Sequence, residues 1–265
     1  MNSLASLFGA DGEVFGTWSQ IASEDLIDML GAAGYAFTIV DCEHTAISVE
    51  TAERLFRACK ANRVAPLVRV PSNDRVWIAR CLDAGALGIV VPGIESAASA
   101  QAAVAASRFG PEGSRGACPC VRAGDHFVRD WPAYAKAQES GTGVILLVET
   151  RAGLDVIEEI CAGPGVRGLL VGPFDLSVSL GHRGDYQHPE VQAGVLRMLD
   201  AARACGVPVM MPVFSPHLVE AGAQVETWRA RGVRHFVLGT DKILIGDQFG
   251  RYLAALKPAG AATAV

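Results

Sequence analysis

Eight short apolar segments recur along the chain, and a stretch with helical spacing separates each segment from the next. Val, Ile and Leu dominate the segments, which mostly run continuously instead of alternating apolar with polar residues. Continuous apolar runs are typical of parallel strands that are covered on both faces. The predicted strands are residues 13–18, 35–41, 65–70, 86–92, 143–149, 167–172, 207–212 and 235–239.

The segments between these strands predict helices. Ser48 and Asp74 each precede an apolar-periodic stretch, so each side chain can cap the helix that follows. A third helical pattern runs from Pro189 to Gly206. Residues 108–142 are longer than the other connections and contain several Gly and Arg, and we expect a loop with a short helix there.

Eight strands alternating with helices over about 250 residues predict an α/β fold, a single (β/α)8 TIM barrel. We expect one domain over residues 1–265, because no linker or low-complexity tract interrupts the chain, and a flexible tail over about 257–265. A doubly wound open sheet is the alternative. The chain has no G-x-G-x-x-G motif after its first strand, which argues against a dinucleotide site.

Composition narrows the class of partner. The net charge is −5 and no basic run occurs, which argues against nucleic acid. No apolar stretch approaches the roughly 20 residues of a membrane helix, and the N-terminus lacks the pattern of a signal peptide. The seven cysteines show no zinc spacing, and only Cys118 and Cys120 lie close together. We therefore expect a cytoplasmic protein without a membrane partner. The mean hydropathy of +0.27 further predicts a homo-oligomer.

Ionisable residues follow several predicted strands. In a (β/α)8 barrel the active site forms where the carboxyl ends of the strands meet. Each of these residues alone has an ordinary structural explanation, such as a salt bridge or a helix cap. Together they predict a site at one rim. The residues are Asp41, Glu43 and His44 at the end of the second strand, Arg69 at the end of the third, Glu149 at the end of the fifth, Asp175 at the end of the sixth and Asp241 at the end of the eighth.

The residue types indicate the chemistry of that rim. Glu149 and Asp175 are hard oxygen ligands on adjacent strands, which suit Mg²⁺ or Mn²⁺ better than structural zinc. Arg69 offers a planar fork that fits a carboxylate, and His44 can transfer protons near neutral pH. Lys242 is the only lysine near a strand end, so a Schiff-base mechanism is disfavoured.

Motifs along the chain resemble those of the HpcH/HpaI aldolase family, the metal-dependent class II pyruvate aldolases of the 4-hydroxy-2-oxoheptanedioate aldolase type. The resemblance extends over most of the chain, roughly from Gly16 to Gly246. The matching segments are DCEH (41–44), PLVRVP (66–71), LDAGALGIVVP (82–92), RFGPEGSRG (108–116), VETRAGLDVIEEI (148–160), VGPFDLSVSLG (171–181) and LGTD (238–241).

The resemblance implies a role for each site residue. It makes Glu149 and Asp175 the ligands of a divalent metal (Mg²⁺, Mn²⁺ or Co²⁺), Arg69 the residue that holds pyruvate, and His44 the base. Asp83 would orient that histidine across a subunit contact, and Asp41 is a second candidate for the same task. The resemblance also places the pyruvate carboxylate beside the backbone of Gly172, Pro173, Phe174 and Asp175, and it implies a hexamer.

The implied reaction is cleavage of a 4-hydroxy-2-oxo acid to pyruvate and an aldehyde, or the reverse addition, through a metal-stabilised pyruvate enolate. One alternative is related enolate chemistry on an acyl-CoA or oxaloacetate-type substrate, as in citrate lyase beta or a citrate synthase. Another is a non-catalytic barrel that binds a small acid. The loop at 117–127 (ACPCVRAGDHF) departs from the family pattern, so the resemblance does not identify the aldehyde.

Overall fold

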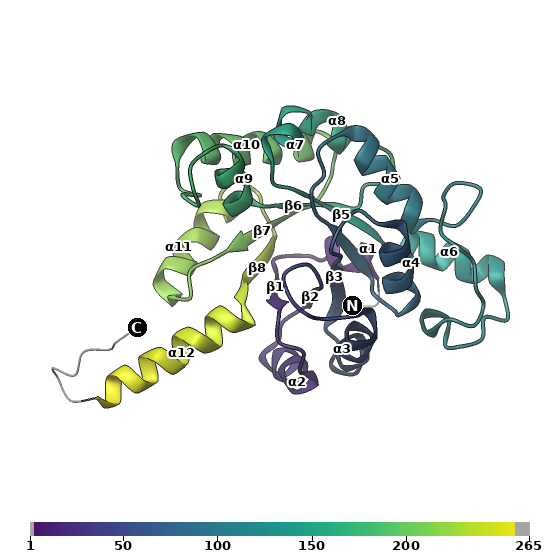
Figure 1. The fold of residues 1–265 in the computed structure, drawn as a ribbon, viewed down its shortest axis with the longest axis horizontal. Helices are drawn as coiled ribbons and strands as arrows, with labels where there is room; N and C mark the ends of the chain where they lie inside the picture. Colours follow the sequence, from purple (N-terminus) through teal and green to yellow (C-terminus); the bar gives the residue numbers. More distant parts are fainter. Residues whose placement is uncertain (1–2, 258–265) are drawn as a thin grey trace.

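The computed structural model describes residues 3–257 and shows a closed barrel of eight parallel strands, in which each strand pairs with the next along the chain and β1 pairs with β8 (Figure 1). This confirms the predicted (β/α)8 barrel and excludes the open sheet. All eight predicted strands are present. They are β1 (Val14–Ser19), β2 (Phe37–Asp41), β3 (Ala65–Arg69), β4 (Gly88–Val91), β5 (Gly143–Val148), β6 (Gly168–Val171), β7 (Val209–Val213) and β8 (His235–Thr240).

Alternate strand residues enter two separate cores. On β5, Ile145 and Leu147 point into the barrel, whereas Val144, Leu146 and Val148 pack beneath the surrounding helices. Both faces are therefore buried, which is the physical reason why the strands read as continuous apolar runs.

The helices form the outer layer (Figure 1). Ser48 and Asp74 cap their helices as predicted, by accepting hydrogen bonds from first-turn amides. The insertion at 108–142 contains a 3-10 turn, η1 (Arg122–Gly124), and one helix, α6 (Trp131–Gly141), in agreement with the prediction of a loop with a short helix. The remaining outer helices are α2 (Glu24–Ala33), α3 (Val49–Asn62), α4 (Arg75–Asp83), α5 (Ala97–Ser107), α7 (Arg151–Asp155), α8 (Ile157–Ala162), α9 (Pro173–Ser179), α10 (Pro189–Ala204) and α11 (Leu218–Arg229).

A short N-terminal helix, α1 (Leu4–Phe8), contributes to the inner core at the amino ends of the strands. Leu4 and Leu7 belong to the inner core. The buried His235 at the start of β8 donates from Nε2 to the carbonyl oxygen of Leu7 (3.2 Å), and burial lowers its pKa. This contact anchors α1, which the sequence patterns did not predict.

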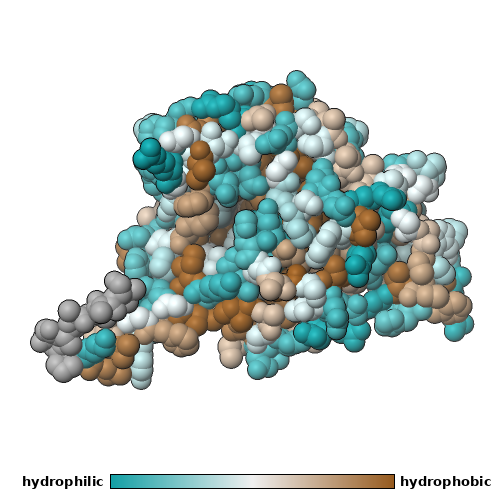
Figure 2. All heavy atoms as spheres, in the orientation of Figure 1, coloured by the Kyte–Doolittle hydropathy of each residue, from teal (hydrophilic) through white to brown (hydrophobic). Residues whose placement is uncertain are grey.

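The last helix, α12 (Asp241–Leu256), extends away from the barrel instead of packing against it (Figure 1). It exposes Phe249, Tyr252, Leu253 and Leu256 to solvent, and apolar side chains are visible along this arm in Figure 2. Among residues 3–257, no helix has the length and apolar character needed to cross a membrane. The predicted flexible tail lies outside the described residues beyond Lys257.

Candidate active site

A cavity of about 190 Å³ opens at the carboxyl ends of the strands, where the sequence predicted the site. Four predicted residues from four different elements line it together. They are His44, Arg69, Glu149 and Asp175. Gly172 and Phe174 also line the cavity, and Trp18, Gln20, Phe214 and Thr240 complete its polar and aromatic wall.

Arg69 is held by Asp41, its register partner on the neighbouring strand. Nε of Arg69 donates to Asp41 Oδ1 at 2.9 Å and Nη2 donates to Oδ2 at 2.8 Å. Burial alone would raise the pKa of Asp41, but the hydrogen bonds and charge of Arg69, with a further bond from Gln20, hold it below its ordinary value. The guanidinium also lies 4.4 Å from the ring centre of Trp18. Arg69 is thus fixed in orientation before any substrate arrives.

Asp41 also shapes the loop that carries His44. Its Oδ1 accepts hydrogen bonds from the backbone amides of Glu43 (3.1 Å) and His44 (3.3 Å). Asp41 was a candidate for orienting the imidazole of His44. In this structure it instead contacts the backbone of the loop and the guanidinium of Arg69. The side chain of His44 is 62% exposed at the rim, where it can reach a substrate.

Glu43 adds a third carboxylate that the sequence reasoning did not assign. Its Oε2 lies 3.1 Å from Arg69 Nη1 and 3.7 Å from His44 Nε2, but it accepts no hydrogen bond of good geometry among the described residues. Burial raises its pKa, and the nearby charges of Asp41 and Asp175 add to that effect. The sequence signal for Glu43 was its position between Asp41 and His44, two residues that were already predicted to belong to the site.

Glu149 follows β5 and turns toward the cavity. Its Oε1 accepts a hydrogen bond from the amide of Gly93 at 3.0 Å. Burial, together with the negative charges of Asp175 and Glu43, raises the pKa of Glu149 to about 7. The backbone of Gly172 at the end of β6 approaches this side chain so closely that a Cβ there would lie 2.6 Å from the Cβ of Glu149. Only glycine leaves room for the carboxylate.

Asp175 lies in the first turn of α9, directly after β6. Gly172 is the N-cap of this helix, and no side chain makes a capping hydrogen bond. Helix capping therefore does not explain the aspartate at position 175. First-turn amides of a helix lack intrahelical partners and favour anions. The N–H groups of Phe174 and Asp175 belong to this turn, whereas Pro173 has none to give.

The carboxylates of this cavity fit a divalent cation. Glu149 and Asp175 offer hard oxygen ligands from adjacent strands, with space for further ligands in the cavity. The pKa of about 7 at Glu149 reflects its burial first and then the negative charges of Asp175 and Glu43, and a bound cation would favour the ionised carboxylate. The close packing of Gly172 keeps the Glu149 side chain in place for such an ion.

Asp83 and the loop at 117–127 are not in the cavity. Asp83 ends α4 and pairs with Arg115 of the insertion at 2.6 Å. No residue of the 117–127 loop lines the cavity within this chain. A role for Asp83 at His44, or for the loop at the aldehyde, would require a second copy of the chain and stays a prediction.

Gln20 and Asp241 link the ends of β1 and β8. Asp241 Oδ2 accepts from the amides of Gln20 (2.9 Å) and Ile21 (2.8 Å), and Gln20 Nε2 donates to Asp41 Oδ2 (2.9 Å). The strand-end carboxylate at 241 therefore supports the site by positioning Gln20, and it does not line the cavity.

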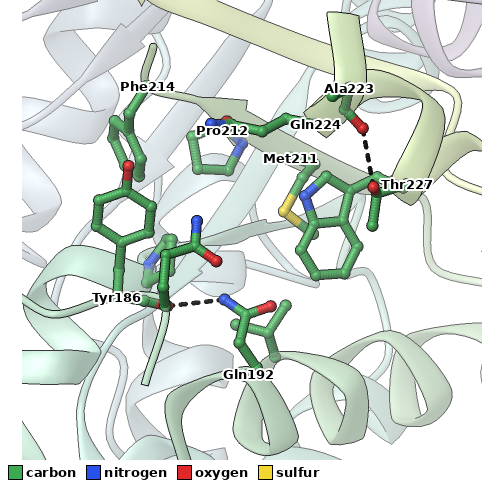
Figure 3. Close-up of a pocket in the computed structure, with 12 residues that line it drawn as sticks. Tyr186, Gln192, Met211, Pro212, Phe214, Ala223, Gln224 and Thr227 are labelled. Atoms are coloured by element: carbon green, nitrogen blue, oxygen red, sulfur yellow. Dashed lines mark hydrogen bonds between the residues drawn. The ribbon is translucent and has the colours of Figure 1, made fainter. Parts of the chain in front are cut away.

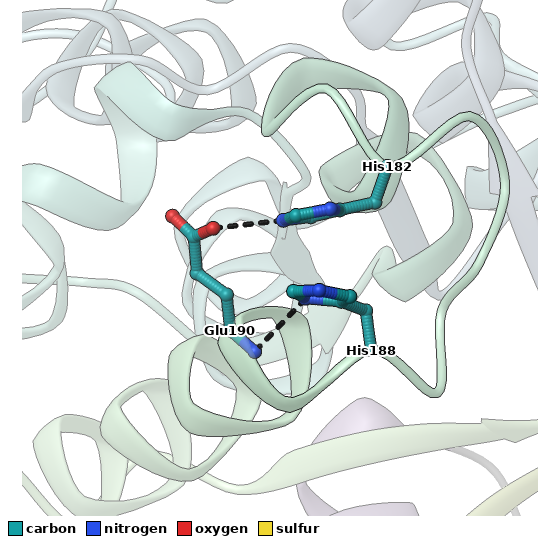
Figure 4. Close-up of side chains that lie close together, drawn as sticks. All are labelled: His182, His188 and Glu190. Atoms are coloured by element: carbon teal, nitrogen blue, oxygen red, sulfur yellow. Dashed lines mark hydrogen bonds and ion pairs between the residues drawn. The ribbon is translucent and has the colours of Figure 1, made fainter.

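A second group of possible metal ligands lies nearby, formed by His182, His188 and Glu190 (Figure 4). The two rings are stacked with centres 3.5 Å apart and planes 18° apart. A metal lies in the plane of each imidazole that binds it, so stacked rings cannot share an ion without rearrangement. His188 Nδ1 already accepts the amide of Glu190, and Arg151 pairs with the Glu190 carboxylate. This group fastens the loop between α9 and α10.

Comparison with known proteins identifies the family of the chain. The profile of the family described as HpcH/HpaI aldolase/citrate lyase matches residues 14–244. The 2-dehydro-3,6-dideoxy-6-sulfogluconate aldolase of Pseudomonas putida is 34% identical over 250 residues, which cover 94% of this chain and 95% of the relative. The 5-keto-4-deoxy-D-glucarate aldolase of Enterobacter sp. (strain 638) is 32% identical over 254 residues, with 96% and 93% covered.

A solved structure extends the similarity to a different named activity. The citrate synthase SbnG superimposes with a TM-score of 0.85 at 28% sequence identity, and the match covers 96% of this chain and 97% of that one.

Proposed function

Because the chain belongs to the HpcH/HpaI aldolase/citrate lyase family, we propose that it cleaves a 4-hydroxy-2-oxo acid to pyruvate and an aldehyde, or catalyses the reverse addition. It is an enzyme of the aldolase type, a carbon–carbon lyase, like its relatives. The observation that carries the proposed reaction is the convergence of two carboxylates, a fixed arginine and an exposed histidine in one cavity.

Arg69 and the first turn of α9 form the pyruvate-binding part of the proposal. Asp41 accepts from Nε and Nη2 of the guanidinium, and Glu43 lies 3.1 Å from Nη1, so the protein orients the remaining N–H groups before substrate binds. The amides of Phe174 and Asp175 offer further donors to the pyruvate carboxylate at a helix N-terminus. Binding therefore requires little reorganisation of the site.

Glu149 and Asp175 would hold a divalent cation beside the 2-oxo acid. When bound, such an ion supplies a Lewis acid that stabilises negative charge developing on the keto oxygen. Mg²⁺, Mn²⁺ and Co²⁺ are the candidates for this site.

His44 is the proposed proton-transfer group. It lines the cavity with its side chain largely exposed, so it can reach the aldehyde half of a bound substrate. In the cleavage reaction His44 would remove the proton of the C4 hydroxyl. In the reverse reaction, aldol addition, it would return a proton to the newly formed hydroxyl. Glu43, 3.7 Å from Nε2, is placed to stabilise the imidazolium that forms.

The similarity to a citrate synthase supports the alternative, enolate chemistry on an acyl-CoA or oxaloacetate-type substrate. Coenzyme A phosphates would need free basic groups at the rim. Of the three arginines that could serve, Arg115 pairs with Asp83, Arg122 donates to the carbonyl of Ala84, and the guanidinium of Arg129 lies over the ring of Phe127. None of the three lines the cavity within this chain, which favours the aldolase reaction.

A homo-oligomer, and specifically a hexamer, is part of the proposal. The apolar side chains of α12 lie in solvent in the single chain, which is unfavourable for a helix of this length. A second copy that covers α12 would remove them from water. The seven unpaired cysteines suit a reducing compartment, so we also propose a cytoplasmic location.

Two assays test the function. Cleavage of 4-hydroxy-2-oxo acids is followed by a pyruvate-coupled assay with and without Mg²⁺, Mn²⁺ or Co²⁺, and product analysis separates aldolase from acyl-CoA chemistry. Exchange of the methyl protons of pyruvate with solvent deuterium is followed by NMR. A barrel that only binds a small acid would show no metal-dependent exchange.

A further inference from the structure

Two cavities outside the active site differ in charge. The cavity between α10 and α11 is lined by uncharged residues, among them Tyr186 and Gln192 (Figure 3). A larger cavity, of about 370 Å³, lies between α3 and the insertion at 108–142, and three cationic side chains line it, those of Lys60, Arg63 and Arg122. We call it the basic cavity. No Asp or Glu of residues 3–257 lines it.

The basic cavity lies at the amino ends of the strands, opposite the active site. Val64, Leu87 and Thr142, which directly precede β3, β4 and β5, all line it. Arg69 ends β3, which has five residues, so the two ends of this strand are roughly 15 Å apart. No residue lines both cavities, and the basic cavity is therefore a separate site.

Arg122 is the most buried of the three cations, with 15% of its side chain exposed. Its Nη1 donates to the carbonyl oxygen of Ala84 at 3.0 Å. The carboxylate of Glu53 lies 4.0 Å from its Nε without a hydrogen bond, and binds Arg57 instead at 2.6 Å. Burial, together with the charge of Arg57, lowers the pKa of Arg122, although Glu53 and Asp125 act in the opposite direction. The positive charge is therefore incompletely compensated, and an added anion would stabilise it.

The backbone around Arg122 makes room for the guanidinium and holds its loop. Gly85 has a φ of +105°, and a Cβ at this position would lie 2.5 Å from Nη1 of Arg122, so any other residue would displace the guanidinium. The amides of Gly124 and His126 both donate to the carbonyl oxygen of Val121, at 3.1 and 3.0 Å. Arg122 is thus held in place at the cavity wall.

The other polar side chains of the cavity mainly offer hydrogen-bond donors. Within the described part of the chain, the guanidinium of Arg63 makes no hydrogen bond and no ion pair, and Lys60 has only a solvent-exposed contact with Asp125 at 3.6 Å. Gln138 accepts from Arg115 through Oε1 (3.2 Å), which leaves its amide N–H groups available. A ligand that bonds to these groups must supply acceptors.

Helix capping explains only part of this arrangement. Cations near the C-terminal end of a helix often bind its last carbonyl groups. Arg122 does so at Ala84, the C-cap of α4. Arg63 is the C-cap of α3, but its side chain donates to no carbonyl of residues 3–257, so capping does not account for its position. Beside these cations, Phe56 and Leu87 form an apolar floor that suits the body of an organic molecule.

We propose that the basic cavity binds a small organic oxyanion, whose phosphate or carboxylate group contacts Arg122 and Arg63 and whose body lies on the floor of Phe56 and Leu87. Guanidinium groups bind the oxygens of both head groups through paired N–H donors. This site goes beyond the proposed aldolase reaction and does not depend on it.

Isothermal titration calorimetry of the full-length, metal-free protein with phenyl phosphate, benzoate and benzamide tests the proposal. The three probes share one aromatic ring and differ in the charge of the head group. We expect at least one of the two anions to bind and the neutral benzamide not to bind. The anion that binds shows whether the site takes a phosphate or a carboxylate. Binding of neither anion, or binding of benzamide as tightly as the anions, would overturn the inference.

Arg122→Gln and Arg63→Gln should each lower the affinity for the bound anion roughly tenfold, because each removes a charged hydrogen-bond donor. Arg63 is exposed, so its variant tests the site even if Arg122→Gln is unstable. Arg54→Gln is the matched control, because Arg54 lies on the same helix, pairs with Glu24 and does not line the cavity.

Arg69→Lys distinguishes the basic cavity from the active site and should bind the anion as the wild type does. Affinity that falls in Arg69→Lys but not in the two cavity variants would place the anion in the active site and overturn the inference. Unchanged affinity in both Arg122→Gln and Arg63→Gln, or an equal loss in Arg54→Gln, would overturn it as well.

Discussion

The backbone of Gly172 and the side chain of Glu149 are in such close contact that any side chain at position 172 would have to displace Glu149. A Cβ there would lie 2.6 Å from the Cβ of Glu149 and 3.0 Å from its Oε2. Gly172 does not have a positive φ, with φ at −106°, so its need is for space and not for an unusual backbone. The glycine of the segment LLVGPFD thus places one proposed metal ligand while the same segment delivers the other.

Gly172→Ala is expected to weaken divalent-metal binding roughly 10–100-fold, the range seen when groups that position metal ligands are altered. The added methyl group must displace the Glu149 carboxylate, since the backbone of β6 is held in the barrel. Titration with Mn²⁺ measures the effect, and circular dichroism checks the fold. Gly222→Ala, at a helical glycine with open space around it, is the control and should bind metal as the wild type does.

Glu149→Gln and Asp175→Asn should each abolish cleavage and reduce metal affinity more than the Gly172 variant does, because each removes a charged ligand. Both substitutions keep the size of the side chain, so the thermal midpoint of unfolding should not fall. Activity that survives EDTA treatment would show that the two carboxylates do not hold a required metal.

Metal affinity should depend on pH through Glu149, whose pKa is raised to about 7 by burial and by neighbouring carboxylates. Below pH 7 the carboxyl is protonated in the metal-free protein and must release its proton before it binds an ion. The apparent affinity should therefore fall by up to about tenfold per pH unit below 7 and level off above about pH 8. Calorimetry in buffers of different ionisation enthalpy counts the released proton. Glu149→Gln should remove the dependence, and an affinity that does not change between pH 6 and 8 in the wild type would contradict it.

His44→Ala is expected to lower turnover by roughly 10²–10⁴-fold, the usual contribution of a general acid or base. Pyruvate and metal affinity should change little, because Arg69, Glu149 and Asp175 hold those ligands in the proposal. Steady-state kinetics and pyruvate titration separate the two effects. Turnover at the wild-type rate would show that another group transfers the proton.

Arg69→Ala should give the complementary defect and lose pyruvate binding as well. It also leaves the buried Asp41 without its partner, which costs about 3–5 kcal/mol for a broken buried ion pair. Arg69→Lys keeps the charge but not the two-pronged geometry, so it is the more informative variant. Pyruvate affinity equal to that of the wild type in a folded Arg69→Lys protein would argue against the binding role.

The exposed face of α12 predicts self-association. Leu253→Asp and Phe249→Asp place charges on this face and should lower the oligomeric state measured by sedimentation velocity. Met29→Asp, at an exposed apolar residue of α2, tests whether any surface charge has the same effect. A monomeric wild type at micromolar concentration would contradict the prediction of a homo-oligomer.

The sequence by itself determined the barrel and the rim of the site. Parallel strands buried on both faces must be apolar throughout, so the eight runs were visible, and strands that all point one way bring their carboxyl ends together. Residues at or close to the carboxyl ends of strands, such as Arg69, Glu149 and Asp175, could therefore be assigned to one cavity without a structure.

Only the tertiary structure decided which of these residues contact one another. Strand register sets Asp41 opposite Arg69, so it binds that guanidinium and not the imidazole of His44. Close packing also explains why position 172 is a glycine, because its neighbour Glu149 follows a different strand, β5. The course of α12 also depends on tertiary structure, because this helix leaves the barrel and keeps its apolar side chains exposed. Local patterns specify which residues are buried, whereas contacts between residues far apart in the chain depend on the geometry of the whole fold.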